Sequence, residues 1–477
     1  MTVTLTSRHD LNLDTLRRVA WAGEGVAFSQ EALVHMAAAR QRFMRLLEDP
    51  AVSVYGVTSG YGQNARVRLT PEQRALHARR PPIQQAAGWG DPLPDRVTRA
   101  IIFARLANFI DGGAAISPAV ALAVAGMLDG RPLPTVPTRG QGGAGEILSL
   151  SHLFGALAQS APVAEKDVIS LINGSPAASA LVADAALAAG ARLPLAVQIL
   201  ALAAEAFNTP LTHFDPALGA LWNAPHDAWA LAQINAAVGA GHGGARRPYQ
   251  APVSFRILPR MLGQARRAQL LAAEVAGESL AAVTDNPVML SPDAAHPDGR
   301  IISTGGYHNP YAVMAMDAVT AANANLIVLA GRMAAKLLDG HVSLQADQFG
   351  LGGTAAYLGC LPMAITGYEE EARLCAMPTL LPGSESGGFG QDDVASPVFP
   401  AWTKQDRSGS LLEAALASLA FIAVRGLDHL ERPVPPALAA LAAEVRRHLP
   451  DVDSPQALGP AAYGLEAELR RRVFTVS

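Results

Sequence analysis

The glycine-dense stretch at residues 139–145 has the composition best suited to chemistry. It reads Arg-Gly-Gln-Gly-Gly-Ala-Gly and runs into Glu146 and an apolar Ile-Leu-Ser-Leu run, which predicts the first turn of a helix. Amide groups at such a helix start carry partial positive charge and suit a carboxylate or an oxyanion. The candidate donors are Gly142, Gly143, Ala144 and Gly145. A tight surface turn capped by a helix is the alternative.

Composition narrows the class of protein. The chain has 477 residues, half of them apolar and only 5% aromatic, with a net charge of -4. These values suit tightly packed long helices and give no reason to expect nucleic acid or a membrane surface as partner. Cys360 and Cys375 lack metal-ligand spacing and are too few for a disulfide framework, so we expect no metal and a reducing, cytoplasmic location.

The helical patterns predict a mostly α protein in two parts. Residues 1–195 form an N-terminal part with lid loops, including a helix capped by Ser29 and another from about residue 94 to 110. Residues 196–477 form a bundle of long helices, preceded by a buried segment and helix at 167–188. The predicted bundle helices are 196–207, 225–239, 260–283, 310–339, 364–377, 409–432 and 436–448. Polar residues interrupt the apolar stretch 311–338, which favours a buried bundle helix over a membrane span.

The glycine loop resembles the motif of the aromatic amino acid ammonia-lyases and aminomutases, the histidine, phenylalanine and tyrosine lyase family. Their loop reads Gly-Ser-Val-Gly-Ala-Ser-Gly-Asp-Leu-Ala-Pro-Leu-Ala-His, and its Ala-Ser-Gly tripeptide cyclises and loses water to give methylidene-imidazolone. Residues 143–145 are Gly-Ala-Gly here, and Ala144 has no hydroxyl to lose. The resemblance therefore implies an ammonia-lyase-like bundle with a globular, lid-bearing N-terminal part, in which no cofactor is expected.

Further motifs follow in the family's order between residues 33 and 396. Residues 55–62, Tyr-Gly-Val-Thr-Ser-Gly-Tyr-Gly, are similar to the family's mobile lid, which makes Tyr55 the expected catalytic base. A tyrosine can act as a base only if its pKa near 10 is lowered, as an Arg or a helix N-terminus would do. Asn173, in Leu-Ile-Asn-Gly-Ser, resembles the asparagine that contacts the electrophile and the substrate.

Other positions resemble substrate-binding residues, with departures. Residues 250–256, Gln-Ala-Pro-Val-Ser-Phe-Arg, are similar to Gln-Asp-Pro-Tyr-Ser-Leu-Arg, so Gln250 is expected in the site and Arg256 would clamp a carboxylate. Val253 stands where the family has a second essential tyrosine. Gln85 replaces the histidine of Ser-His-Ala-Ala-Gly and cannot titrate.

Two later segments complete the resemblance. Residues 390–394, Gly-Gln-Asp-Asp-Val, resemble Asn-Gln-Glu-Asp-His, which places Gln391 in the site and Asp392 where a glutamate faces the substrate amine. Tyr307 takes the place of the phenylalanine in Gly-Asn-Phe-His. Without the resemblance, paired acids on a loop are as well explained as solvated or capping groups.

These residues predict an electrophile-free relative of the ammonia-lyases, in specialised metabolism. It would catalyse acid-base addition, elimination or intramolecular cyclisation on a small molecule activated by a carboxylate or carbonyl group. One alternative is a conventional ammonia-lyase or aminomutase whose serine has been mutated to Ala144, and another is a non-catalytic binding or scaffold protein. The resemblance also implies a homotetramer with active sites shared between chains.

Overall fold

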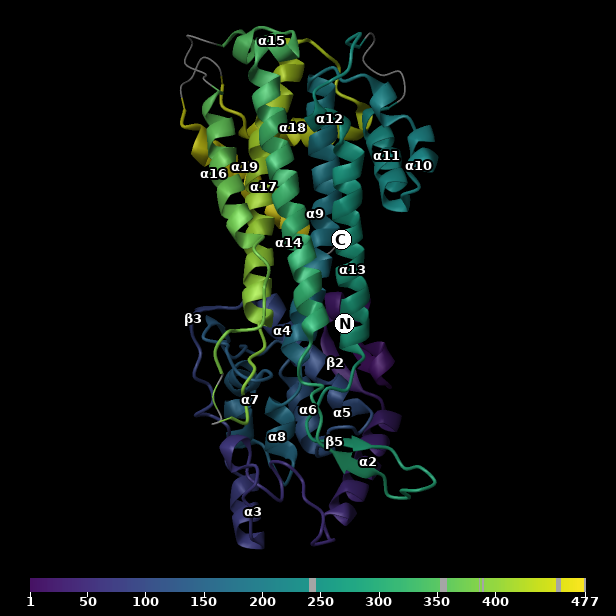
Figure 1. Cartoon of the computed structure of the whole chain (residues 1–477), viewed down its shortest axis with the longest axis vertical. Helices are drawn as coiled ribbons and strands as arrows, with labels where there is room; N and C mark the ends of the chain where they lie inside the picture. The colour runs from purple at the N-terminus through teal and green to yellow at the C-terminus, as the bar shows by residue number, and fades with distance from the viewer. Residues whose placement is uncertain (240–245, 352–357, 386, 388–389, 452–455, 476–477) are drawn as a thin grey trace.

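The chain folds as a long helical bundle standing on an N-terminal part made of shorter elements (Figure 1). The computed structural model describes residues 1–239, 246–351, 358–385, 387, 390–451 and 456–475. Helices dominate, and the strands pair only two by two: β1 with β2 in parallel, β3 with β4 and β5 with β6 antiparallel. The predicted mostly α fold is confirmed.

The N-terminal part carries the short elements. They are β1 (Thr2–Leu5), α1 (Leu13–Leu16), β2 (Gly25–Phe28), α2 (Gln30–Leu46), α3 (Pro71–Ala78), β3 (Trp89–Pro92), α4 (Asp95–Arg105), α5 (Ala107–Ile110), α6 (Pro118–Gly126), β4 (Pro137–Arg139), α7 (Ile147–Ser160) and α8 (Asp167–Ile172). The Ser29 hydroxyl accepts the Ala32 N–H at 3.1 Å, so it caps α2 as the sequence predicted. The predicted helix at 94–110 is present as α4 and α5.

The bundle is built around four long helices: α9 (Pro176–Ala206), α13 (Leu258–Leu280), α14 (Pro310–Leu338) and α17 (Val398–His429). Around them lie α10 (Ala217–Trp222), α11 (Pro225–Val238), α12 (Val253–Arg256), β5 (Val288–Leu290), β6 (Arg300–Ile302), α15 (Gly340–Ser343), α16 (Cys360–Cys375), α18 (Ala439–His448) and α19 (Leu458–Phe474). α14 begins as its sequence dictates, because Pro310 takes the first helical position and Asn309 accepts the Ala312 N–H at 3.1 Å.

One boundary in the bundle differs from the prediction. We expected separate helices at 167–188 and 196–207, whereas α9 runs unbroken from Pro176 to Ala206 with Pro194 inside it. A proline costs a helix one hydrogen bond, and packing of α9 against α13 and α17 offsets that cost. The real break comes earlier, at residues 173–175 between α8 and α9.

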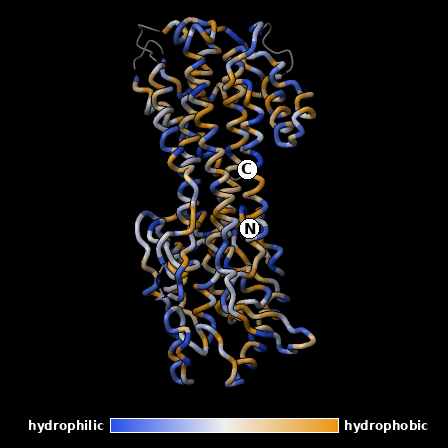
Figure 2. The backbone as a smooth tube through the Cα atoms, viewed as in Figure 1, coloured by the Kyte–Doolittle hydropathy of each residue, from blue (hydrophilic) through white to orange (hydrophobic). Residues whose placement is uncertain are grey.

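Two hydrophobic clusters fill the molecule. One joins the N-terminal part to the lower half of the bundle and the other fills its upper half. Figure 2 shows that apolar residues run along the whole length of the bundle helices. By length and hydropathy, the stretches Asp167–Ala206, Pro310–Leu338 and Val398–His429 could each cross a membrane, and 67%, 67% and 89% of their most apolar windows are buried inside the fold.

Candidate active site

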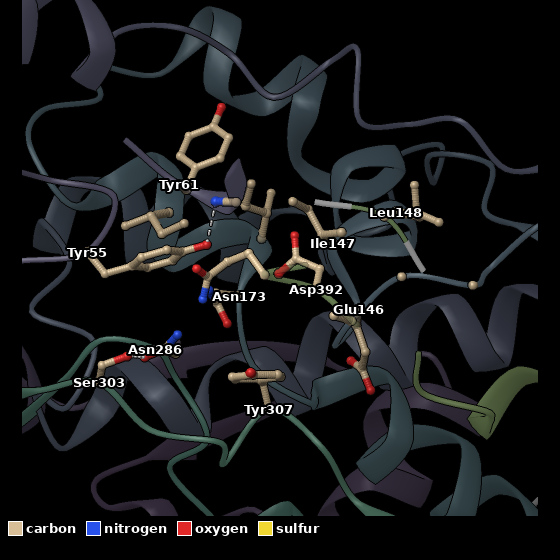
Figure 3. Close-up of a pocket in the computed structure, with 18 residues that line it drawn as sticks. Tyr55, Tyr61, Glu146, Ile147, Leu148, Asn173, Asn286, Ser303, Tyr307 and Asp392 are labelled. Carbon is tan, nitrogen blue, oxygen red and sulfur yellow. Dashed lines mark hydrogen bonds between the residues drawn. The ribbon is translucent and has the colours of Figure 1, made fainter. Parts of the chain in front are cut away.

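A cavity of about 270 Å³ at the lower end of the bundle brings together segments far apart in the sequence (Figure 3). Its walls come from the lid, the glycine loop, the end of α8, the loops on either side of β5 and β6, and the loop before α17. The sequence-predicted residues that line it are Tyr55, Gly142, Gly143, Ala144, Asn173, Tyr307, Gln391 and Asp392.

Tyr55 lies on the lid with its phenol group held inside the cavity wall. Its oxygen accepts a hydrogen bond from the main-chain N–H of Gly62 at 2.9 Å. Burial raises the pKa of Tyr55, the bond from Gly62 opposes this, and the negative charge of Asp392 adds to the rise. Within the single chain Tyr55 therefore lacks the lowered pKa that a catalytic base needs, because no cation among the described residues acts on the phenol.

Asp392 closes the cavity on the side of its own loop. Its Oδ2 atom lies 3.4 Å from the position that a Cβ atom would take on Gly62, so the carboxyl group packs against the lid. Burial, with a smaller contribution from Asp393, raises the pKa of Asp392 above its usual range. A carboxylate with a raised pKa accepts protons more readily than an exposed one.

Asn173 ends α8 with its side chain in the cavity wall. Its Oδ1 atom accepts the N–H of Gly174 at 2.8 Å, and its main-chain carbonyl accepts a hydrogen bond from Nη1 of Arg105. Gly174 has a φ of +107°, and a Cβ atom there would lie 2.9 Å from Nη1 of Arg105 and 3.0 Å from Oγ1 of Thr284. Only glycine fits this turn.

The glycine loop runs into α7 as predicted. Gly145 has a φ of +69°, and a Cβ atom there would lie 3.1 Å from the ring of Tyr307. Glu146 precedes α7, yet its carboxylate accepts the N–H groups of Ala177 and Ala178 at 2.5 and 2.6 Å, so it caps α9. Glu146 is 5% exposed, and burial raises its pKa to about 8.

Gln85 lies behind the cavity wall. Its Nε2 atom donates to the phenol oxygen of Tyr61 at 3.1 Å, and Tyr61 lines the cavity while Gln85 does not. Gln85 therefore contacts the cavity wall through Tyr61 and does not line the cavity.

Gln250 and Arg256 lie at the opposite end of the bundle, where Figure 1 shows α12. Arg256 donates to the main-chain oxygen of Ala251 at 3.0 Å. The 23 residues of α13 separate α12 from the cavity-lining Asn286, which corresponds to about 35 Å of helix. The expected clamp by Arg256 on the cavity is not formed within one chain.

The structure also shows residues that sequence reasoning missed. Asn286 and Ser303 line the cavity, and directly behind Asn286 the carboxylate of Asp285 binds Nζ of Lys166 at 2.7 Å and Nη2 of Arg105 at 3.7 Å. The side chains of all three ions are fully buried. The Asp-Asn-Pro sequence at 285–287 gives no indication of these buried partners.

A polar cavity at the end of a helical bundle, lined by phenols, carboxamides and carboxyl groups, has the composition of an enzyme active site. Residues 11–165 and 158–447 match the model of a family described as aromatic amino acid lyase. The chain belongs to this family, as the motifs predicted, and is an enzyme of the ammonia-lyase superfamily.

Individual relatives support the same family assignment. The chain is 29% identical over 464 residues to a histidine ammonia-lyase of Streptomyces coelicolor, which covers 90% of this chain and 88% of the relative. It is 27% identical over 478 residues to that of Sorangium cellulosum, with 92% of each covered.

Two solved structures share the fold. Tyrosine aminomutase from Streptomyces globisporus has a TM-score of 0.88 at 22% identity, covering 99% of this chain and 98% of that one. The ergothioneine-degrading enzyme ergothionase from Treponema denticola has a TM-score of 0.89 at 18% identity, covering all of both chains.

The residues of the glycine loop do not fit the methylidene-imidazolone that this resemblance would imply. Ala144 lines the cavity with a methyl group, and a methylidene arm needs a side-chain hydroxyl that leaves as water. The main-chain oxygen of Gly143 accepts the N–H of Ser396 at 3.1 Å, which holds the loop against the segment before α17.

Proposed function

We propose that this chain is an electrophile-free member of its family that catalyses acid-base addition, elimination or intramolecular cyclisation. Its substrate is a small molecule in which a carboxyl or carbonyl group acidifies a neighbouring C–H bond. Ala144 carries the proposal, because the loop that would supply an electron sink has no group to lose. The cavity nevertheless keeps three phenols, two carboxyl groups and three carboxamides in its wall.

We assign one proton transfer to each of two titratable groups at the lid, Tyr55 and Asp392. Tyr55 has a raised pKa, so at neutral pH it enters the reaction as a phenol that donates a proton. Asp392 is the group that accepts one, and its raised pKa makes it a stronger base. In an elimination, Asp392 takes the proton beside the carbonyl group and Tyr55 protonates the leaving group, while an addition runs the same transfers in reverse.

Other residues of the cavity wall would bind the substrate and stabilise the enolate without exchanging protons. Asn173 holds the substrate by its amide group, and the Tyr307 ring packs on Gly145 beside the cavity. An enolate formed by proton removal is stabilised by hydrogen-bond donors already in place, because they need no reorganisation as charge develops.

We propose that Arg256 acts in the active site of a second chain. It lies about 35 Å of helix from the cavity in its own chain, so an assembly with shared sites is the arrangement in which it reaches a substrate carboxylate. We propose a homotetramer with composite sites, which light scattering tests directly.

Solvent exchange tests the chemistry without knowledge of the natural substrate. Native protein is incubated in heavy water with a panel of carboxylic acids, ketones and thioesters, and deuterium beside the carbonyl group is measured by NMR. We expect exchange into at least one member of the panel, and its loss in Tyr55→Phe and Asp392→Asn. Release of ammonia from histidine, phenylalanine or tyrosine by the native protein would overturn the proposal, as would a panel without exchange.

A further inference from the structure

A second cavity lies at the upper end of the bundle, away from the candidate active site. Its volume is about 410 Å³, against about 270 Å³ for the active-site cavity. Its walls come from α16, α17 and α19, with residues 449–451 after α18. Figure 1 shows these helices at the end of the bundle opposite the N-terminal part. We call this space the distal cavity.

The wall of the distal cavity is mostly apolar. Aliphatic side chains come from Leu358, Leu361, Leu449, Leu458 and Ala462. Protein interiors leave few voids larger than a water molecule, so a space of this size is more than a packing defect. Small-molecule sites commonly have this size, with apolar walls and a few polar groups that converge on the ligand.

Arg425 on α17 supplies the positive charge of this wall. It is half-buried, and its Nη2 atom donates to the main-chain oxygen of Pro450 at 2.8 Å, but no carboxylate among the described residues pairs with it. Asp451, the acidic residue of the lining, is exposed, so water screens its charge. A partly buried guanidinium without an ionic partner is costly, and an anion that pairs with it offsets that cost.

Tyr368 on α16 provides a second donor to the distal cavity. Its hydroxyl forms no hydrogen bond with the part of the chain that the structure describes. Burial and the charge of Glu466 raise the pKa of Tyr368, so the phenol keeps its proton at neutral pH. A guanidinium and a phenol in one apolar wall match the two oxygen atoms of a carboxylate.

We propose that the distal cavity is a second small-molecule site, which binds a carboxylic acid with an apolar body through Arg425 and Tyr368. The site is separate from the proposed active site of the same chain, because about 40 Å of helix lies between Arg425 and the start of α17 at Val398. The charge of the ligand pairs with the guanidinium, and its apolar body covers the aliphatic wall. The proposal does not depend on the reaction proposed above.

Cys360 reports binding directly, because it is exposed and lines the distal cavity. Full-length protein is treated with N-ethylmaleimide in the presence of octanoate, octanamide or acetate, and modification of each cysteine is followed by mass spectrometry. Octanoate should slow modification of Cys360 at concentrations about tenfold lower than octanamide requires, since only octanoate pairs with the guanidinium. Acetate lacks the apolar body and should give no protection at the same concentrations.

Cys375 is an internal reference in the same experiment. It lies outside the lining of the distal cavity, so its rate of modification should not respond to octanoate. Neither cysteine lines the active-site cavity, and binding of octanoate there would leave the readout unchanged.

Two variants test the charge and the space separately. Arg425→Gln should remove the difference between octanoate and octanamide, whereas Arg373→Gln, at an exposed position of α16 outside the lining, should behave like the native protein. Gly459→Leu should fill the cavity and abolish protection by both compounds, because a Cβ atom on Gly459 meets no other atom within 4 Å. Gly459→Leu keeps Arg425, so it carries the test if Arg425→Gln does not fold.

Three results would overturn the inference. They are a native protein in which millimolar octanoate does not protect Cys360, equal protection by octanoate and octanamide, and protection by octanoate that persists in folded Arg425→Gln or Gly459→Leu. The proposed function has a separate readout, because deuterium exchange is measured on compounds bound in the active-site cavity. Absence of exchange would remove the proposed chemistry and leave the distal site standing, and absence of protection would do the opposite.

Discussion

The phenol oxygen of Tyr55 accepts the main-chain N–H of Gly62 at 2.9 Å, so the two ends of the lid loop are joined by the side chain proposed to react. The bond leaves the phenol hydrogen available to another acceptor, which suits a proton donor. It also lets the reactive group be removed at little structural cost, since one such bond contributes about 1 kcal/mol.

Tyr55→Phe should therefore reduce kcat by about a hundredfold to ten-thousandfold, the usual contribution of general acid-base catalysis. The melting temperature should change little, because the ring remains and only one hydrogen bond is lost. Steady-state kinetics on a substrate found by deuterium exchange, with thermal unfolding in parallel, provides the measurement. A variant that keeps full activity would show that Tyr55 is not the proton carrier.

The pH profile of kcat/KM distinguishes a donor from a base at Tyr55. With Asp392 as the base, activity should rise as pH passes the raised pKa of that carboxyl group, and fall only when pH exceeds the raised pKa of Tyr55. A tyrosine that acted as the base would instead give activity that climbs through the alkaline range. Asp392→Asn should abolish the acid limb together with most of the turnover.

Ala144→Ser should not produce an ammonia-lyase. The serine restores a hydroxyl, but Val253 and Gln85 still differ from the residues that the family pattern has there. We expect no ammonia from histidine, phenylalanine or tyrosine in a coupled assay, and an intact mass without loss of water beyond the substitution itself. Ammonia release by this variant would support the conventional lyase with a mutated serine.

Glu146 should make the stability of the fold depend on pH. Its pKa is about 8 in the folded chain against an ordinary value of 4.5, so the folded state holds the proton more tightly than the unfolded state. Stability should be greatest below about pH 4.5 as far as this group is concerned, and should fall by up to about 1.4 kcal/mol per unit as pH rises toward 8.

Urea unfolding at several pH values between 5 and 8 measures this slope. Glu146→Gln carries no titrating group and should flatten the slope, at a cost of one hydrogen bond to the start of α9. An identical slope in the native protein and the variant would assign the pH dependence to other residues.

Mixed assemblies test whether active sites are shared. Tyr55→Phe and Arg256→Ala should each be nearly inactive alone, because one lacks the proton donor and the other the carboxylate clamp. Co-expressed in equal amounts, they should regain about a quarter of native activity if each site takes Tyr55 and Arg256 from different chains. Mixing without any recovery would show that both residues of a site come from the same chain, and a fully active Arg256→Ala would show that Arg256 has no role.

The sequence predicted the elements that local signals control. Ser29 and Pro310 mark helix starts by their own backbone and capping chemistry, and Tyr55, Asn173 and Asp392 were found through ordered motifs and do line one cavity. Pro194 suggested a break between two helices. The break does not occur, because α9 packs against other helices in a way that the local sequence does not reveal.

Two features of the site were beyond sequence reasoning for a different reason. Asn286 could not be recognised as a cavity residue, since its donor is exposed to the cavity only through bonds from Ser303 and Thr304 made in the folded chain. Arg256 matches its motif, yet its distance from the cavity follows from the length of α13 and not from the motif.

The contacts of the Arg105 guanidinium limit which substitutions can change the substrate specificity of this enzyme. Because it touches both Asn173 and Asp285, any change that shifts the loop of one disturbs the loop of the other. Improved activity from changes in these two loops would therefore need several simultaneous substitutions. Among the described residues of the loop that carries Gln391 and Asp392, none binds Arg105. Libraries selected for new substrates should therefore accumulate their early substitutions there and on the lid, and leave the neighbours of Arg105 untouched.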